Sequence, residues 1–450
     1  MPPALTSGRV LVSALAATGP LTVVNLIASP AYPGGLILML VGFFVVGLVL
    51  LAFAAGYGAV SRRAPSPGPL YAAVTHGLGR PPGLGAALIA LLSYGALQLS
   101  LYAAAATTLR LAVPWWQVAL VCWLVVGLLG TVGPRLLGVL LGVVVAAEVV
   151  VIAAVSAVAS RPALTLPAHL DRPALGLLLA GVALTFAGFE TAAGFAEGPG
   201  RPSITRTTGV AVLLLSVLYA GAAGTPGPFL ATATTPIAPW AEPAARVVLL
   251  TGLLAGMVAL HHTSTRYFVA LARDRRPVDS ARGAGTASLV QTVIMGLVLC
   301  ALVAFGPLAG VPRWVGIGGA IGILVLLTAA SLAALIFLNR TPGGENAGQR
   351  LLAPIVATVG LGALSYLAFA NLGALLGTGP QTRIVPIALG VAALAGVGYG
   401  LVLRVADPVT YARIGLSGMA IMTSPVSTRI PKSREPGAHR PERIKSEPIS

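Results

Sequence analysis

Charged residues are scarce in this sequence: only 9% of its 450 residues are Asp, Glu, Lys or Arg, whereas 56% are hydrophobic. A soluble chain of this length needs a charged surface around its core, and this composition excludes one. Apolar runs of about 20 residues, the length that crosses a bilayer as a helix, recur from end to end. The sequence therefore predicts an all-α polytopic membrane protein.

Cysteine and catalytic motifs are also scarce. The two cysteines, Cys122 and Cys300, lie inside apolar runs, which favours small core residues over a disulfide or a metal site. The chain contains no His-Glu-x-x-His, no Gly-x-Ser-x-Gly and no phosphate-binding Gly-x-x-x-x-Gly-Lys. We therefore predict neither an enzyme nor an ATP-driven pump, and no cofactor.

Acidic residues number 12 against 28 basic ones, which gives a formal net charge of +16. Most of the basic residues are arginines of short loops, and the C-terminal tail carries the rest. Such a distribution orients membrane helices and does not build a nucleic-acid-binding face. The predicted partners are thus the lipid bilayer and a small molecule, not nucleic acid.

Twelve spans are expected, at about 10–29, 36–60, 84–109, 115–131, 135–159, 174–197, 206–225, 244–272, 286–306, 315–338, 351–376 and 384–403. With the N-terminus inside, thirteen loop arginines fall on the inner side and six on the outer side. The positive-inside rule then predicts that both termini are cytoplasmic. The Arg-, Ala-, Gly- and Pro-rich composition favours a bacterial cell membrane. Residues 404–450 are expected to form a basic, largely disordered cytoplasmic tail.

Two spans carry helix-breaking residues near their middle. The first contains Thr18-Gly19-Pro20 and the sixth contains Gly188-Phe189-Glu190. Transporters built from inverted repeats often break a helix at the same place in each repeat. The matched positions predict two five-helix repeats, at about 10–159 and 174–338, followed by two extra helices at about 351–403. Two six-helix halves would instead require a long central loop, which the sequence lacks.

Three stretches resemble the amino acid–polyamine–organocation superfamily of permeases. They are FAGFETAAGFAEGPGRP at 186–202, SRRAPSPGPLYAAVTHGLGRPPG at 61–83 and TRYFVALARDRRPV at 265–278. The first is similar to the family's sixth-helix pattern, the second to its loop before the third helix, and the third to its Arg-Tyr and Arg-Asp signature after the eighth helix. Their order and spacing match the family, so the chain resembles a divergent bacterial member.

The resemblance implies a five-plus-five inverted-repeat core in which an amino acid lies between broken helices one and six. Helix N-termini would face the carboxylate of the substrate, and exposed carbonyls would receive its ammonium group. The residues expected to frame this site by position are Thr18, Gly19, Pro20, Leu21, Phe186, Ala187, Gly188 and Phe189. They are small or apolar, which favours a neutral amino acid over a basic one.

Two acids interrupt the apolar runs, Glu190 and Glu148. Acids inside membrane helices are costly and mark ion or proton pathways. A buried carboxyl favours its neutral form and releases its proton when water reaches it, so both residues are candidates for proton coupling. Glu190 could instead only cap the helix break. Glu148 stands where some relatives place a Lys, and it could bind a cation, take a proton or hydrogen-bond between helices.

Polar side chains mark two further helices. Tyr94, Gln98 and Tyr102 are spaced four apart and share one helix face, where they could line the substrate pathway or hydrogen-bond to a neighbouring helix. His261 and His262 are adjacent, point to different faces and make a poor metal site, so they are expected at the membrane interface.

The turn after the sixth span departs from the family pattern. Gly198 replaces a second acid, and Ser203-Ile204-Thr205 replaces a basic, proline-containing run. These residues lie at the expected inner gate. Two hypotheses follow: a proton-coupled secondary transporter for an amino acid or related small amine, or a membrane amino acid sensor that keeps the fold and binds without transport.

Overall fold

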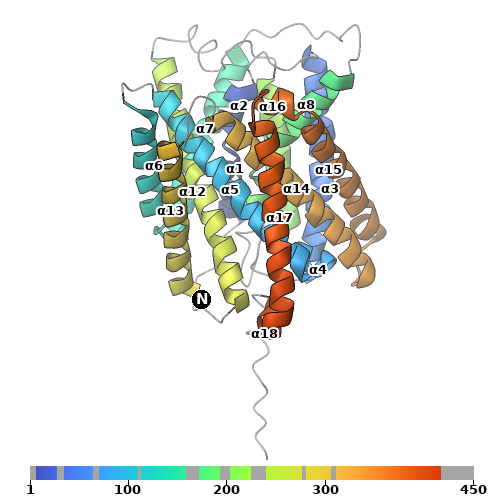
Figure 1. Ribbon diagram of the computed structural model, residues 1–450. Coiled ribbons are helices and arrows are strands. Elements are labelled where there is room, and N and C mark those ends of the chain that lie inside the picture. Colours follow the sequence, from blue (N-terminus) through green and yellow to red (C-terminus); the bar gives the residue numbers. More distant parts are fainter. Residues whose placement is uncertain are drawn as a thin grey trace, which may run out of the picture.

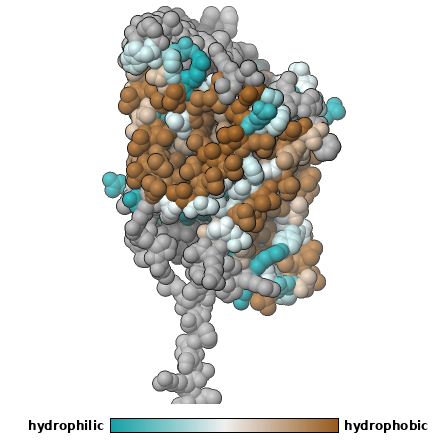
Figure 2. All heavy atoms as spheres, turned by 90° about the vertical axis from the view of Figure 1, so that its left-hand side faces the viewer, coloured by the Kyte–Doolittle hydropathy of each residue, from teal (hydrophilic) through white to brown (hydrophobic). Residues whose placement is uncertain are grey.

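The computed structural model describes residues 7–27, 35–63, 70–109, 113–158, 172–192, 203–223, 240–275, 280–305 and 311–416. Within these ranges all regular secondary structure is helical, and the long helices lie side by side in one bundle (Figure 1). A broad band of apolar side chains covers the face of the bundle seen in Figure 2. Phe44, Val217 and Leu394 illustrate the exposed apolar residues, since each is at least 66% exposed. This surface suits contact with lipid tails.

The described helices agree with the predicted spans. Eleven helical segments of the described residues are long and apolar enough to cross a membrane, and α6 is a shorter apolar helix. Each predicted span overlaps one of these twelve segments, and the predicted ends at 28–29, 159, 193–197, 224–225 and 306 lie outside the described residues. In chain order the elements are α1 (Ser7–Thr18), α2 (Pro20–Ile27), α3 (Gly35–Arg63), α4 (Leu70–Leu78), α5 (Arg80–Leu109), α6 (Trp115–Leu129), α7 (Pro134–Val158), α8 (Arg172–Leu184), η1 (Phe189–Thr191), α10 (Ile204–Ala222), α12 (Ala241–Arg275), α13 (Ser280–Phe305), α14 (Val311–Arg340), η2 (Gly348–Leu352), α15 (Ala353–Ala370), α16 (Leu372–Leu376), α17 (Gln381–Ala406) and α18 (Pro408–Arg413).

One element was not predicted, because the stretch 61–83 reads as a loop. It contains the short helix α4, whose residues are mostly buried and which packs against α5 and α14. Gly77 permits this packing: a β-carbon there would lie 2.2 Å from the backbone oxygen of Ala333. His76 lies in this helix and is half-buried.

The expected tail boundary at residue 403 is also wrong. Helix α17 continues to Ala406, and α18 follows directly. Asp407 explains the second helix, because its Oδ1 accepts the backbone N–H of Thr410 at 3.0 Å and so caps the N-terminus of α18. Residues 404–416 thus belong to the folded domain. The rest of the expected tail, 417–450, lies outside the described residues.

Basic side chains gather at the end of the bundle that carries α4 and α18 in Figure 1. Helix α3 ends in Arg62 and Arg63, α12 ends in Arg275, and α14 ends in Arg340. The Nε of Arg63 lies 3.4 Å from a carboxylate oxygen of Glu345 in the connection between α14 and η2. The other end of the bundle carries α2, α8 and α16. Arginines therefore close several helices at the end that carries α4 and α18.

Candidate functional site

The first helix is broken where the sequence predicts. Helix α1 ends at Thr18, Gly19 adopts a left-handed φ of 61°, and α2 begins at Pro20. Glycine tolerates this conformation, and proline has no N–H to continue the helical hydrogen bonds. No described backbone N–H donates to the carbonyl of Ala17 or Thr18. The break therefore leaves two acceptors inside the bundle.

The second break follows α8. The chain leaves the helix after Leu184 through short turns and enters η1, and Gly188 has a φ of 115°. Thr191 stabilises the turn, because its hydroxyl and its backbone N–H both donate to the Gly188 carbonyl, at 2.7 and 3.1 Å. Glycine is required at this φ, since other residues adopt it only under strain.

The two breaks lie against each other. A β-carbon on Gly188 would lie 2.7 Å from the carbonyl oxygen of Ala17 and 2.8 Å from the backbone nitrogen of Thr18. Only the missing side chain permits this approach of two backbones. The two breaks expected to frame the site therefore meet where Gly188 lies against Ala17 and Thr18.

Glu190 lies at this junction and is only 2% exposed. One carboxylate oxygen accepts the backbone N–H of Gly188 at 2.9 Å, and the other accepts the Tyr94 hydroxyl at 3.0 Å. Glu190 thus caps the break and also ties it to α5. A capping role and a role in proton coupling use the same position and are compatible.

The polar stripe of α5 is buried and hydrogen-bonded. Tyr94 contacts Glu190, as described above, while the Gln98 amide donates to the Tyr102 hydroxyl at 2.6 Å. The amide of Gln291 in α13 donates in turn to the Gln98 carbonyl oxygen at 3.1 Å. Gln291 was not predicted as part of this network, although an amide inside an apolar run indicates a buried hydrogen bond. The stripe therefore links α5 both to the second break and to α13.

Glu148 approaches the first break from α7 and is 1% exposed. Its carboxylate lies beside the backbone N–H of Leu21, the first free donor of α2, and near the Tyr219 side chain. Glu148 Oε1 and the Tyr219 hydroxyl have no hydrogen-bond partner among the described residues. Gly252 of α12 makes room for the carboxylate, because a β-carbon there would lie 2.0 Å from Glu148 Oε1. The two intramembrane acids, distant in sequence, both contact the broken helices.

The histidine pair, expected at the membrane interface, is packed between helices. His261 is buried, and its Nε2 lies 2.9 Å from the Ser288 hydroxyl of α13. The rings of His261 and His262 lie edge to face, with centres 6.0 Å apart. Among the described residues, no group of three His, Cys, Asp or Glu side chains is arranged to hold a metal ion.

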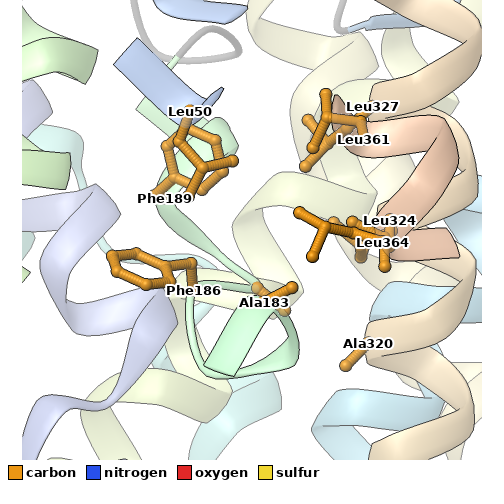
Figure 3. Close-up of a pocket in the computed structure, with 11 residues that line it drawn as sticks. Leu50, Ala183, Phe186, Phe189, Ala320, Leu324, Leu327, Leu361 and Leu364 are labelled. Carbon is orange, nitrogen blue, oxygen red and sulfur yellow. The ribbon is translucent and has the colours of Figure 1, made fainter. Parts of the chain in front are cut away.

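A small apolar hollow of about 10 Å³, room for roughly one water molecule, lies beside the second break (Figure 3). Phe186 and Phe189 contribute one wall, and Leu324 and Leu364 stand opposite them; Ala187 also lines the hollow. Every residue that lines the hollow is Ala, Ile, Leu or Phe. Such a surface accepts an apolar group and offers no partner to a charged one.

The sequence matches no protein-family model and no curated protein. The structure, however, is similar to the crystal structure of a manganese transporter from Eremococcus coleocola in complex with an aromatic bis-isothiourea substituted compound. The two chains share 13% identity, with a TM-score of 0.54, over 91% of this chain and 94% of that one. The chain is therefore a polytopic membrane protein with the fold of a secondary transporter. The predicted all-α fold, with its inverted-repeat core and broken helices one and six, is confirmed.

Proposed function

We propose that this protein is a proton-coupled secondary transporter for a neutral amino acid or a related small amine. The observation that supports it best is the junction of the two breaks, where free backbone carbonyls lie close to two buried acids. Transporters of this architecture bind substrate where helices are broken, because exposed backbone groups replace the water that a charged substrate loses.

The substrate's ammonium group would bind the carbonyl oxygens of Ala17 and Thr18, which no described backbone N–H occupies. Its side chain would lie against Phe186 and Phe189, and the small apolar hollow there would have to widen to admit it. This hollow favours an aliphatic or aromatic side chain over a charged one.

Glu190 would carry the coupling proton. When neutral it can remain buried, and when water enters from one side it can release the proton there. Its bonds to Gly188 and Tyr94 would then change with the geometry of the break, which couples proton binding to alternating access. Glu148 would take a second proton or a cation at the other face of the first break. The arginine-rich end would face the cytoplasm of a bacterial cell, together with both termini.

Manganese, the metal for which the similar transporter is named, is not favoured as a substrate of this chain. Mn²⁺ prefers carboxylate, carbonyl and imidazole ligands. The described part of the chain brings no three acidic, histidine or cysteine side chains together, so a Mn²⁺ ion here would depend mainly on backbone carbonyls.

Uptake into proteoliposomes tests the proposal. A panel of labelled neutral amino acids and Mn²⁺ would be offered to the wild type, Glu190→Gln and the control Glu242→Gln, with and without an inward proton gradient. Glu242 is a surface acid paired with Arg246 and serves as the matched control. We expect gradient-stimulated amino acid uptake by the wild type and the control, and none by Glu190→Gln.

Other results would change the conclusion in defined ways. Uptake that is indifferent to both the gradient and Glu190→Gln would retain transport and contradict proton coupling. Saturable binding without accumulation would favour the sensor hypothesis, and uptake of Mn²⁺ alone would contradict the proposed substrate class.

A further inference from the structure

A chain of tyrosines leads from Glu190 to a second buried carboxylate, Asp274. The Tyr94 hydroxyl donates to Glu190 at 3.0 Å, and the ring of Tyr94 lies 5.7 Å from that of Tyr267. The ring of Tyr267 lies 5.9 Å from that of Tyr71, whose hydroxyl donates to Asp274 Oδ2 at 2.9 Å. Three consecutive tyrosines thus lie between the two acids.

The connection runs through the protein interior. The three tyrosines are at most 1% exposed, and Asp274 is 3% exposed. Bulk water therefore does not reach these side chains in this conformation, and proton movement along them would pass from hydroxyl to hydroxyl.

The series of tyrosines and acids draws its members from the three stretches that carry the family resemblance. Glu190 belongs to 186–202, Tyr71 to 61–83, and Tyr267 and Asp274 to 265–278. In the structure these stretches are the second break, α4 and the end of α12. No role was predicted for Tyr71, Tyr267 or Asp274. In the structure the three side chains lie next to one another.

Tyr267 is the middle tyrosine of the series. Its hydroxyl is fully buried between Tyr94 and Tyr71 and lies near the Tyr94 hydroxyl and the backbone of Leu70, but it makes no well-formed hydrogen bond with a described residue. Buried tyrosine hydroxyls are normally paired. The connection is complete when this hydroxyl accepts from Tyr94 and donates to Tyr71.

Asp274 lies in the last turn of α12, at the arginine-rich end of the bundle. The backbone N–H of Gly415, after α18, donates to Asp274 Oδ2 at 3.0 Å, the same oxygen that accepts from Tyr71. His76 of α4 is a titratable group nearby. Burial lowers its pKa, and so does the positive charge of Arg80, although a hydrogen bond with the backbone of Gly415 acts in the opposite direction. Asp274 is therefore the acid at this end that is positioned to exchange a proton with the Tyr71 hydroxyl.

We propose that Tyr94, Tyr267 and Tyr71 relay the coupling proton between Glu190 and Asp274. The inference rests on the proposed function, in which Glu190 binds that proton. Protonated Glu190 would donate to the Tyr94 oxygen, which frees the Tyr94 O–H to turn toward Tyr267. Each hydroxyl then accepts one proton and gives up its own, and the Asp274 carboxylate receives the last. One proton moves in total, and every tyrosine is neutral before and after.

Glu190 and the relay belong to different parts of the fold: Glu190 lies on the broken segment, whereas the relay residues lie on α4, α5 and α12. The Glu190–Tyr94 hydrogen bond is the point where the two parts meet. A shift of the break would open this bond and disconnect Glu190 from Asp274. The coupling proton would thus leave toward the arginine-rich end only in the conformation that makes this bond.

The test compares Tyr267→Phe, Tyr71→Phe and Asp274→Asn with the wild type in proteoliposomes. Tyr366→Phe is the matched control, because Tyr366 is 71% exposed on α15 and lies outside the chain of hydroxyls. Two activities would be measured on each: accumulation of a labelled neutral amino acid driven by an inward proton gradient, and counterflow of that amino acid without a gradient. Counterflow requires binding and alternating access but no net proton release.

We expect the relay variants to lose about tenfold or more of gradient-driven accumulation, as removal of a positioned proton-transfer group does, while counterflow stays near the wild-type rate. The control should match the wild type in both activities. A variant that fails to fold loses counterflow as well, so the three variants together separate folding from relay.

Three results would overturn the relay. If all three variants accumulate substrate like the wild type, the relay is wrong and the proposed function stands. If every variant loses counterflow and accumulation equally, the tyrosines only support the fold. If the wild type itself shows no gradient-driven uptake, the proposed function fails, and the relay fails with it.

Discussion

Gly188 and Ala17 bring the two broken helices into backbone contact: a β-carbon on Gly188 would lie 2.7 Å from the Ala17 carbonyl oxygen. The contact joins two segments that are 171 residues apart (188 − 17) and fixes where the free carbonyls of the first break lie. The left-handed φ of 115° at Gly188 is part of the same arrangement. A side chain at this position would therefore disturb both the backbone and the junction.

Gly188→Ala should destabilise the protein and abolish substrate binding. A non-glycine residue at such a φ costs about 1–3 kcal/mol, and the clash with the backbone of α1 adds to this. The control is Gly398→Ala in α17, where a β-carbon meets nothing within 4 Å. Thermal melting in detergent, followed with a thiol-reactive dye, should show a lower melting temperature for Gly188→Ala only. Equal melting of both variants would contradict the close approach.

Tyr94 and Glu190 should be energetically coupled. Side-chain hydrogen bonds between membrane helices contribute about 0.6 kcal/mol on average and up to about 1.7 kcal/mol. Tyr94→Phe and Glu190→Gln each alter the bond between them, so their effects on stability should not add. A double-mutant cycle on unfolding measures this coupling. Additive effects would show that the two side chains do not interact in the folded protein.

Gly252 should be intolerant of a side chain only while Glu148 is present. Its β-carbon would overlap Glu148 Oε1, so Gly252→Ala should push the carboxylate away from Leu21 and lower the melting temperature. In a Glu148→Ala background the same change should have a small effect, because the clashing atoms are gone. A glycine substitution that is equally harmful in both backgrounds would contradict this packing.

Much of the fold could be predicted from composition and the length of apolar runs. Membrane helices satisfy their own backbone hydrogen bonds, so a run of about 20 apolar residues specifies a span without knowledge of its neighbours. The breaks at Gly19-Pro20 and Gly188 were equally legible, because glycine and proline act locally on the backbone. Helix α4 was not predicted, since its nine residues are too few for a periodic signal and its stability comes from packing on α5 and α14.

The site could be predicted only in part from the sequence. Glu190, Glu148 and Tyr94 stand out because a polar side chain in an apolar run is costly. Their partners could not be predicted, because the Glu190–Tyr94 bond and the contact between Glu148 and Gly252 depend on how distant helices pack. The burial of Asp274 could not be predicted, because its neighbours in the sequence are arginines and the stretch reads as an exposed loop.

Arg80 should hold α18 on the bundle. Its guanidinium donates to the Ala412 carbonyl at 3.0 Å and lies 5.2 Å from the centre of the Tyr411 ring. Arg80→Ala removes both contacts, so α18 should detach more often and trypsin should cleave after Arg413 faster in detergent. Arg383→Ala, in the first turn of α17, is the control and should leave the cleavage rate unchanged. An unchanged rate in Arg80→Ala would mean that α18 is held by other contacts.

The arginine-rich end should face the cytoplasm. Thr341 follows α14 at that end, and Thr378 lies between α16 and α17 at the other; both are exposed. In a variant whose two cysteines, Cys122 and Cys300, are replaced by alanine, Thr341→Cys and Thr378→Cys would be introduced one at a time. A membrane-impermeant maleimide added to intact cells should label Thr378→Cys, whereas Thr341→Cys should react only after the cells are opened. The reverse pattern would invert the topology, and the proposed relay would then lead protons from Glu190 to the outside.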